Sequence, residues 1–453
     1  MNVRMPVKRL VTAVLINFLT ISSFSWAAGV SEDSFSDWYG DMSERFETEN
    51  VKNTGTSVFP TLLIPMGGEH EGMGTAYTAV SRDASFLEAN PAASSHLEYT
   101  ELALYHNNLI ADTNMEGITY TTRFENLGIG VGGKHLHVPF TSYDDFGAQL
   151  GTARYTETVV AANVSYNFFS SFYFHGLSAG ANLKAAYRNI PERIVADQSA
   201  AGVMTDLGLL TRLHFLKFYS SRNPNFSLGT VLRNVGPPVL DEPLPTTWST
   251  GVAWSPFRPI TLAADYNVPL LLFSDLPPPD PGYAVGAAVT VTDFFTMRTG
   301  FLMQGGNPRF TMGGSVGLRA MTITVNYTLD LTTQLTAFDR ISVHAGFSFS
   351  DRGRSERHEM VRRLYLDALQ AFAGGDLETT IALTRRALAI DPTFQPAAET
   401  LTMATRMNEL QQRMESIRLG DDEVESLDDF DFDFDFDFPE DEEPEDPAPG
   451  EAP

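Results

Sequence analysis

The chain has 453 residues, a formal net charge of -26 and no cysteine. The lack of cysteine excludes a disulfide scaffold, a thiolate metal site and a cysteine nucleophile. The charge is uneven: residues 421–453 hold 17 acidic and no basic side chains, which leaves -9 for the rest. A chain with this excess of acidic over basic side chains has too few cations to neutralise a run of phosphates, so we expect no nucleic-acid partner.

The N-terminus has the three parts of a secretory signal peptide. Basic residues precede an apolar run over residues 10–24, and small residues at positions 25 and 27 form a cleavage pattern. We therefore predict a signal peptide over residues 1–28. The alternative, an anchoring helix, is disfavoured because the run is shorter than the ~20 residues that a bilayer requires. No later stretch has 18 uninterrupted apolar residues, so a membrane-spanning part would consist of strands.

Two segments precede the first expected strand. Residues 29–58 are polar and without clear periodicity, whereas residues 59–96 are rich in Gly, Pro and small residues. Such a composition is typical of compact irregular backbone, and we predict that residues 59–96 form a hatch inside the lumen of a barrel. A surface linker is the alternative, but the apolar Leu62, Leu63 and Ile64 argue against it.

Residues 97–350 consist of segments about ten residues long in which apolar and polar side chains alternate. In 321–330, for example, Met, Ile, Val, Tyr and Leu alternate with Thr, Asn and Asp. This pattern places one face of each strand in an apolar medium and the other in water. About 14 such segments, joined alternately by long and short links, predict a 14-stranded antiparallel outer-membrane β-barrel. A water-soluble sandwich also alternates, but it does not require this parity of loop lengths.

The third expected strand changes phase. Ile129 and Val131 occupy odd positions, whereas Leu136 and Val138 occupy even ones, and the change falls at the glycine-rich stretch Gly130, Gly132 and Gly133. We expect a bulge or an inward kink there, because glycine permits the required backbone freedom. An opening at this point would connect the lumen with the bilayer and serve as a lateral gate. A bulge that only adjusts the curvature of the barrel is the alternative.

The predicted hatch, residues 59–96, carries the residues of a family resemblance. Gly72, Gly74 and Tyr77 in a Gly-x-Gly-x-Ala-Tyr motif, followed by Asn90 and Pro91, resemble the FadL-type long-chain fatty-acid outer-membrane transporters, including an uncharacterised branch found in spirochaetes. The resemblance covers roughly residues 60–350. It implies a 14-stranded barrel, a hatch, uptake of hydrophobic molecules and lateral release at a kinked third strand. Ligand-binding and hatch residues would then be Leu62, Leu63, Ile64, Gly72, Gly74, Tyr77, Asn90 and Pro91.

Several patterns could carry other chemistry. Residues 313–317 match Gly-x-Ser-x-Gly, but a nucleophile elbow needs a strand-turn-helix corner and this serine lies in an alternating strand. His135 and His137 share a strand face without a nearby third ligand, so we interpret them as lumen-facing polar residues. We therefore predict no enzyme activity, no metal site and no cofactor. Side chains that could bind a carboxylate head group, or simply be lumen and loop charges, are Lys134, Arg154, Arg188 and Arg193.

The C-terminal part differs from the barrel. Residues 354–418 show helical periodicity and resemble one tetratricopeptide repeat with a third helix, which predicts a periplasmic segment because an even number of strands returns the chain to its side of entry. Residues 419–453 form an acidic tail in which Asp and Phe alternate from 429 to 438. Mutual repulsion predicts disorder for the free tail. Its spacing of Asp suggests calcium, but Phe436 stands where an EF-hand requires Gly.

The sequence thus predicts an outer-membrane barrel that takes up hydrophobic small molecules, such as long-chain fatty acids, and releases them laterally into the lipid. The alternative is a barrel scaffold or shuttle in which residues 354–453 recruit periplasmic or secreted proteins.

Overall fold

The computed structural model describes residues 58–418 except for 110–111, 144–145, 193–196, 220, 222, 274–277, 305–306 and 331–339. The predicted signal peptide, the polar segment up to residue 57 and the acidic tail lie outside the described residues. The chain forms two compact units, Met1–Glu359 and Met360–Pro453.

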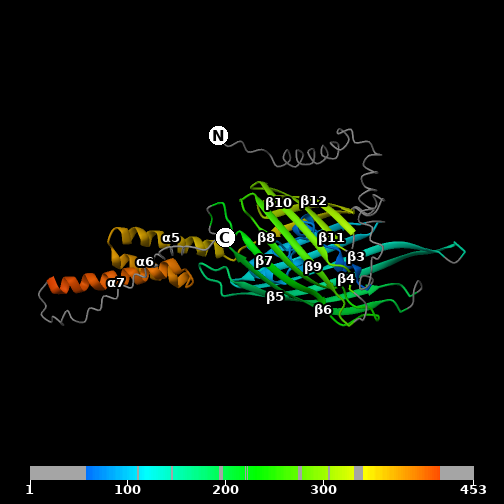
Figure 1. Ribbon diagram of the computed structural model, residues 1–453, viewed down its shortest axis with the longest axis horizontal. Helices are drawn as coiled ribbons and strands as arrows, with labels where there is room; N and C mark the ends of the chain where they lie inside the picture. Colours follow the sequence, from blue (N-terminus) through cyan, green and yellow to red (C-terminus); the bar gives the residue numbers. More distant parts are fainter. Residues whose placement is uncertain are drawn as a thin grey trace, which may run out of the picture. The chain divides into compact units, whose positions relative to one another are not determined.

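In the described part of the first unit, fourteen antiparallel strands close into a barrel (Figure 1). Each strand pairs with its neighbours in the sequence, and β1 closes the ring by pairing with β14 from Glu101↔Ser348 to Asn108↔Ile341. The predicted 14-stranded antiparallel barrel is therefore confirmed. The strands are β1 Glu101–Asn108, β2 Asn114–Phe124, β3 Leu127–Tyr143, β4 Gln149–Phe168, β5 Leu177–Asn189, β6 Ala200–Leu213, β7 Phe226–Val235, β8 Thr246–Trp254, β9 Ile260–Leu270, β10 Gly282–Thr292, β11 Phe295–Gln304, β12 Asn307–Leu318, β13 Met321–Asp330 and β14 Arg340–Ser348.

The two faces of the wall differ in chemistry. Large apolar side chains project outward at alternate positions and are about half exposed, including Ile118, Val131 and Leu183. The intervening side chains, such as Asn182 and Asp206, are polar and buried in the lumen. A closed sheet satisfies all its backbone groups between strands, so an apolar outer face with a polar bore is the arrangement of a transmembrane barrel.

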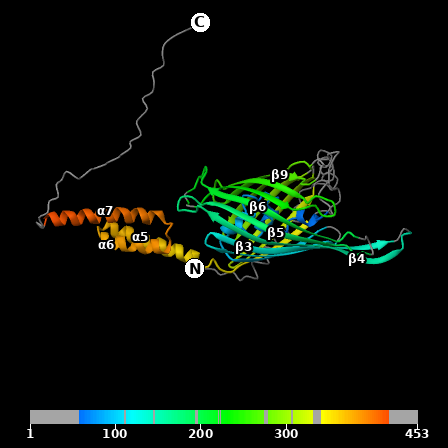
Figure 2. The ribbon, with the colours of Figure 1, turned by 90° about the horizontal axis from the view of Figure 1, so that it is seen from below.

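The hatch lies inside the ring of strands, as the blue segment in Figures 1 and 2 shows. It consists of the short helices η1 Pro60–Leu63, α3 Gly68–Gly72, α4 Phe86–Ala89 and η2 Pro91–His96. Most of its side chains from Val58 to Leu97 are buried. Its irregular backbone is bonded to the wall: Asp265 accepts from Tyr77 N at 3.0 Å and Thr78 N at 2.9 Å.

Glycines of the wall let the hatch backbone approach the strands directly. A Cβ on Gly300 would lie 2.1 Å from Gly74 N, and a Cβ on Gly180 would lie 2.3 Å from Pro91 O. Only glycine permits so close an approach. The same contact recurs around the bore, so the hatch is held from several sides; the other wall glycines whose Cβ would lie within 2.6 Å of the hatch are Gly128, Gly208, Gly229 and Gly286.

The third strand has no bulge at its phase change. β3 pairs with β2 from Asn114↔His137 to Phe124↔Leu127 without a shift, and with β4 it shifts register only between Ser142 and Tyr143. The expected bulge at Gly132 and Gly133 is therefore wrong, whereas the alternative, an inward kink without a register shift, stays a prediction. The backbone keeps its alternation, and the buried Leu136 points into the lumen.

What changes along β3 is the medium outside the wall. Beyond Gly133 the outward positions are polar: His135 is exposed and lies 2.8 Å from Thr158 Oγ1, and Glu116 lies 2.7 Å from His106 Nδ1 on the neighbouring strands. His135 and His137 thus face outward, which corrects the prediction that they face the lumen. The phase change marks the edge of the apolar belt.

β3 and β4 extend past this edge as a long hairpin, visible in Figures 1 and 2. Its strands run to Tyr143 and from Gln149. The sequence pattern predicts a long outer loop over residues 139–152, and most of that segment is instead paired strand.

The second unit is a small helical layer. Its helices are α5 Arg354–Ala373, which begins in the first unit, α6 Leu377–Ile390 and α7 Gln395–Arg418. Asp376 caps α6 by accepting from Thr379 N at 3.0 Å, and Val361, Ala387 and Ala397 form the core. Among the residues that the structure describes, no helix is long and apolar enough to cross a bilayer.

Candidate functional site

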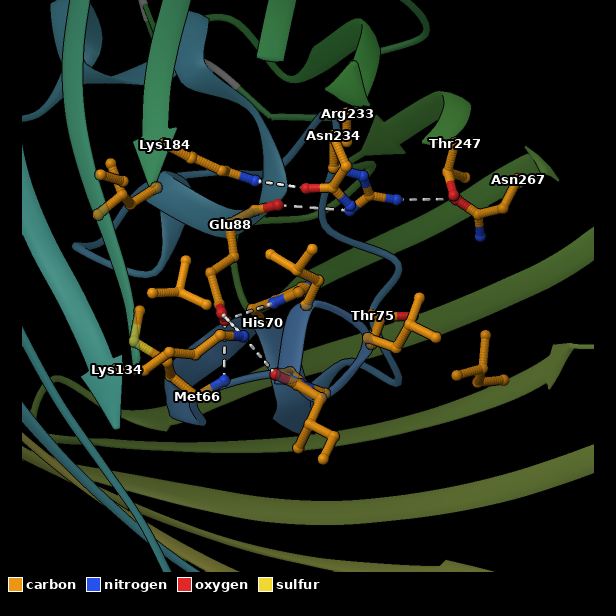
Figure 3. A pocket seen from close by; sticks show the side chains of 18 of the residues that line it. Met66, His70, Thr75, Glu88, Lys134, Lys184, Arg233, Asn234, Thr247 and Asn267 are labelled. Carbon is orange, nitrogen blue, oxygen red and sulfur yellow. Dashed lines mark hydrogen bonds and ion pairs between the residues drawn. The ribbon is translucent and has the colours of Figure 1, made fainter. Parts of the chain in front are cut away.

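A cavity of about 110 Å³ lies between the hatch and the inner wall of the barrel (Figure 3). Its size is comparable to the about 150 Å³ of an apolar cavity that accommodates benzene. The hatch contributes apolar side chains, and the wall contributes cations. The apolar hatch residues that line it are Leu62, Leu63, Ile64, Pro65, Met66 and Leu87; the cations are Lys134, Lys184, Arg233, Arg309 and Arg340.

Four of the five cations are paired with carboxylates. Lys134 pairs with Glu88 of the hatch and also donates to Ile64 O at 2.7 Å. Lys184 lies 2.7 Å from Asp206 and donates to Asn234 Oδ1 at 2.9 Å. The two arginines at the loop end pair in the same way, Arg340 with Glu71 at 2.6 Å and Arg309 with Asp330 at 3.6 Å. These charges are thus largely neutralised before any ligand enters.

Arg233 differs from the other four. Its guanidinium donates to Ser249 Oγ at 2.6 Å, and to Asn267 Oδ1 and Glu88 O at 3.4 Å each. In the part of the chain that the structure describes, no carboxylate oxygen lies within 4 Å of a nitrogen of the Arg233 side chain. With neutral acceptors only in direct contact, this guanidinium retains more of its attraction for an anion than the four paired cations do. Figure 3 shows it reaching in from the wall toward Glu88.

The hatch side of the cavity has its own ionisable pair. Burial lowers the pKa of His70 to about 4, and the nearby cations Arg233, Lys134 and Arg340 act in the same direction against the attraction of Glu88, 3.9 Å away. Burial opposes ionisation of Glu88 as well, but Lys134 and the bond from Met66 N outweigh it and lower the pKa of that carboxyl. At neutral pH the site therefore holds a neutral imidazole beside a carboxylate–ammonium pair.

The residues expected to bind ligand or build the hatch divide into two groups. Leu62, Leu63 and Ile64 line the cavity. The others hold the hatch in shape or against the wall, as described for Gly74 and Pro91 above. Tyr77 is fully buried and donates to Asp83 Oδ1 at 2.9 Å, and Asn90 donates to Thr78 O at 2.9 Å. Gly72 leaves room for the amide of Asn326.

Two of the three glycines proposed as a lateral gate, Gly130 and Gly132, lie beside helix α4. A Cβ on Gly130 would lie 3.0 Å from Phe86 Cζ, and one on Gly132 would lie 2.8 Å from Leu87 Cδ2. Both glycines therefore make space for the hatch. Gly133 is the member of the group that lines the cavity.

Of the four head-group candidates, Lys134 lines the cavity. Arg188 donates to Val58 O at 3.1 Å and so anchors the start of the hatch. Arg154 is exposed on the outer face of β4, opposite Pro139, and Arg193 lies outside the described residues. Three further cations of the cavity, Arg233, Arg309 and Arg340, were not predicted from the sequence. The sequence did contain a sign of them. Each is a basic residue at an inward-facing position near the end of its strand that lies on the long-loop side of the barrel, and such residues face the same part of the lumen.

Other chemistry finds no support in the geometry. Ser315, of the Gly-x-Ser-x-Gly pattern, lies within β12 and contacts Arg298 and Thr324, not a histidine. The described residues contain no cluster of three or more His, Asp or Glu able to hold a metal ion.

A closed barrel with a bonded hatch and a cavity between hatch and wall belongs to the class of membrane β-barrels with an internal plug. The chain belongs to the uncharacterised protein family UPF0164, whose family model matches residues 39–350. A UPF0164 protein of Treponema pallidum (strain Nichols) is 27% identical over 377 residues, which is 80% of this chain and 86% of the relative. A second from the same organism is 25% identical over 385 residues, or 78% and 76%.

Solved structures with weaker likeness include the following two. The Pseudomonas putida toluene transporter TodX has a TM-score of 0.40 and 12% identity, covering 61% of this chain and 95% of its own. CdiB from Acinetobacter baumannii has a TM-score of 0.36 and 10% identity, covering 55% and 60%. Scores of this size transfer no substrate to this chain.

Proposed function

We propose that this protein is an outer-membrane channel that takes up hydrophobic small molecules with an anionic head group, long-chain fatty acids being the expected example. The carrying observation is the cavity, where an apolar hatch surface faces Arg233, a buried cation without a carboxylate partner among the described residues. The head group would bind the guanidinium while the chain lies on Leu62, Leu63 and Ile64. A neutral hydrocarbon would use only the second contact.

The test compares uptake of a fluorescent long-chain fatty acid and of its neutral methyl ester into proteoliposomes. Arg233→Gln should lower fatty-acid uptake about 10-fold, in keeping with the loss of one charge-assisted contact, and leave ester uptake nearly unchanged. Arg154→Gln is the matched control, because Arg154 lies outside the lumen. Equal losses for both ligands, or none, would contradict the role of Arg233.

We further propose that the ligand leaves sideways through the wall at β3, where Gly133 and Val159 border the cavity. Because both ladders of β3 are continuous, release would require the strands to part. The chain has no cysteine, so a disulfide can be introduced cleanly. Val131→Cys with Ala162→Cys, which are direct partners on the outer face of β3 and β4, should block uptake until a reductant is added.

The control lock joins β9 to β10 through Tyr266→Cys and Tyr283→Cys, also direct partners. It should leave uptake intact. Equal uptake by both oxidised variants would show that the wall at β3 does not open.

The second candidate function is a scaffold that recruits periplasmic proteins through residues 354–453. The observation in its favour is the small helical unit, since a lone helix-turn-helix repeat buries little and such repeats normally stack. Removal of residues 360–453 keeps the whole first unit. It should leave uptake unchanged if the barrel is the transporter, and it should abolish capture of partner proteins if the unit is the scaffold.

A further inference from the structure

The cavity between hatch and wall is small compared with a long-chain fatty acid. Its volume of about 110 Å³ is below the about 150 Å³ of an apolar cavity that accommodates benzene. The carbon and two oxygens of a carboxylate alone take up about half of such a space. The enclosed volume therefore holds the head group of an acid and about three further carbons, whereas the rest of a long chain has to lie outside it.

The apolar surface that the hatch gives to this cavity is also short. Residues 62–64 come from the single turn η1 and the residue that follows it. Lys134 donates to the carbonyl oxygen of residue 64 at 2.7 Å and pairs with Glu88, so an ion pair lies directly beside this turn. A methylene chain that continued over this pair would remove its solvation without supplying new partners, which is unfavourable.

Apolar side chains of the wall bound the cavity on two opposite sides. Val159 belongs to β4 and Leu302 to β11, and these two strands are equally far apart in either direction round the closed barrel. Both side chains are buried and line the cavity. They limit how far a ligand can extend across the bore, so the size of Leu302 helps to set the length of ligand that fits.

We propose that this cavity recognises only the carboxylate end of its ligand, so that short-chain monocarboxylates of about four carbons are complete ligands for it. This rests on the proposed function, in which Arg233 binds the head group, and it names the ligand class by size. Acids with longer chains bind by the same end, but their additional carbons gain no apolar contacts in the cavity. The site therefore selects its ligands by the head group and not by the length of the chain.

The test measures the binding of straight-chain acids from acetate to octanoate to the purified full chain in detergent by isothermal titration. Titrations into detergent without protein are subtracted. From acetate to butyrate the affinity should rise about 4-fold per added methylene, as expected for a buried CH₂ group. From butyrate to octanoate it should change by less than about 2-fold in total, because the added carbons lie outside the enclosed space. A rise of about 4-fold per carbon up to octanoate would overturn the proposal.

A variant of the wall tests whether the enclosed volume sets this limit. Leu302→Ala removes about three carbons from the lining, so the affinity should now continue to rise to about heptanoate. Leu210→Ala is the matched control, because Leu210 is equally a buried wall leucine but is not among the described residues that line the cavity. It should leave the limit at butyrate. The same limit in a folded Leu302→Ala protein would overturn the proposal, and the series on the native chain decides the matter if this variant does not fold.

Failure of the proposed function would give a different result. Arg233→Gln should weaken the binding of butyrate about 10-fold and leave that of butan-1-ol, which has no charge, unchanged. If butan-1-ol binds as tightly as butyrate and Arg233→Gln changes neither, the head-group function fails and this proposal fails with it. If the dependence on Arg233 is intact but affinity rises steadily with chain length, this proposal alone is overturned.

Discussion

Two regions of the lumen hold the same hatch by opposite means. Around the bore, wall glycines such as Gly300 and Gly180 remove side chains so that the backbones touch. At the cavity, long cations such as Lys134 and Arg340 reach inward and leave space between wall and hatch. The contacts in the first region fix the position of the hatch, whereas the second region keeps a charged cavity between the hatch and the wall. We infer that stability depends mainly on the glycine contacts and ligand binding on the cations.

The strongest test of this division is Gly300→Ala. Its Cβ would lie 2.1 Å from Gly74 N and 2.2 Å from Met73 C, both backbone atoms that cannot move alone. The free energy of unfolding should fall by about 3 kcal/mol. The measurement is the temperature at which the folded barrel loses its altered migration on a denaturing gel, and this temperature should be lower in the variant. Gly317→Ala, whose nearest contact would be 3.9 Å away, should have no such effect. If the two variants melt alike, the backbone contacts do not hold the hatch.

A smaller loss is expected from Asp265→Ala. This change leaves the buried amides of Tyr77 and Thr78 without their acceptor and should cost about 2 kcal/mol in the same melting assay. Asp265→Asn retains one oxygen and should recover part of the loss. A melting temperature equal to that of the native chain would show that the hatch finds other acceptors.

In the cavity, Glu88→Gln should affect binding more than folding. It releases Lys134 from its carboxylate partner, at a cost of about 2 kcal/mol, and adds a second unneutralised cation near Arg233. The affinity for a fatty acid should therefore rise, while that for its methyl ester should not. Isothermal titration with both ligands checks this, and weaker binding of the acid would contradict it.

The smallest effect concerns pH. Because burial lowers the pKa of His70 from 6.5 to about 4, the unfolded chain binds a proton between these values that the folded chain does not. Stability from this group is complete above about pH 6.5 and falls toward pH 4, by up to about 1.4 kcal/mol per pH unit. His70→Gln should flatten the dependence of the melting temperature on pH in this range, and an unchanged slope would assign it to other groups.

The fold followed from the sequence to a large extent because alternation and loop parity are local properties of each strand. The apolar positions change from odd to even at Gly132 and Gly133, and this change was wrongly taken as a bulge. The same change arises when the outward side chains become polar while the backbone continues unaltered. His135 is polar there because the strand has left the apolar belt.

The site was only partly predictable. Leu62, Leu63 and Ile64 stood out as apolar residues in a glycine-rich segment, and they line the cavity. The pairing of each cation with a carboxylate depends on contacts between residues on different strands, such as that of Lys184 with Asp206. The sequence alone could not distinguish Arg233 from these paired residues.

The hatch precedes β1 in the chain, and the barrel closes only when β14 pairs with β1. Because its short helices contact strands around the ring, we expect the hatch to be enclosed as the barrel closes and not inserted afterwards. A chain without its first hundred residues would lack the hatch, and the strands would have to close without the contacts that the hatch provides.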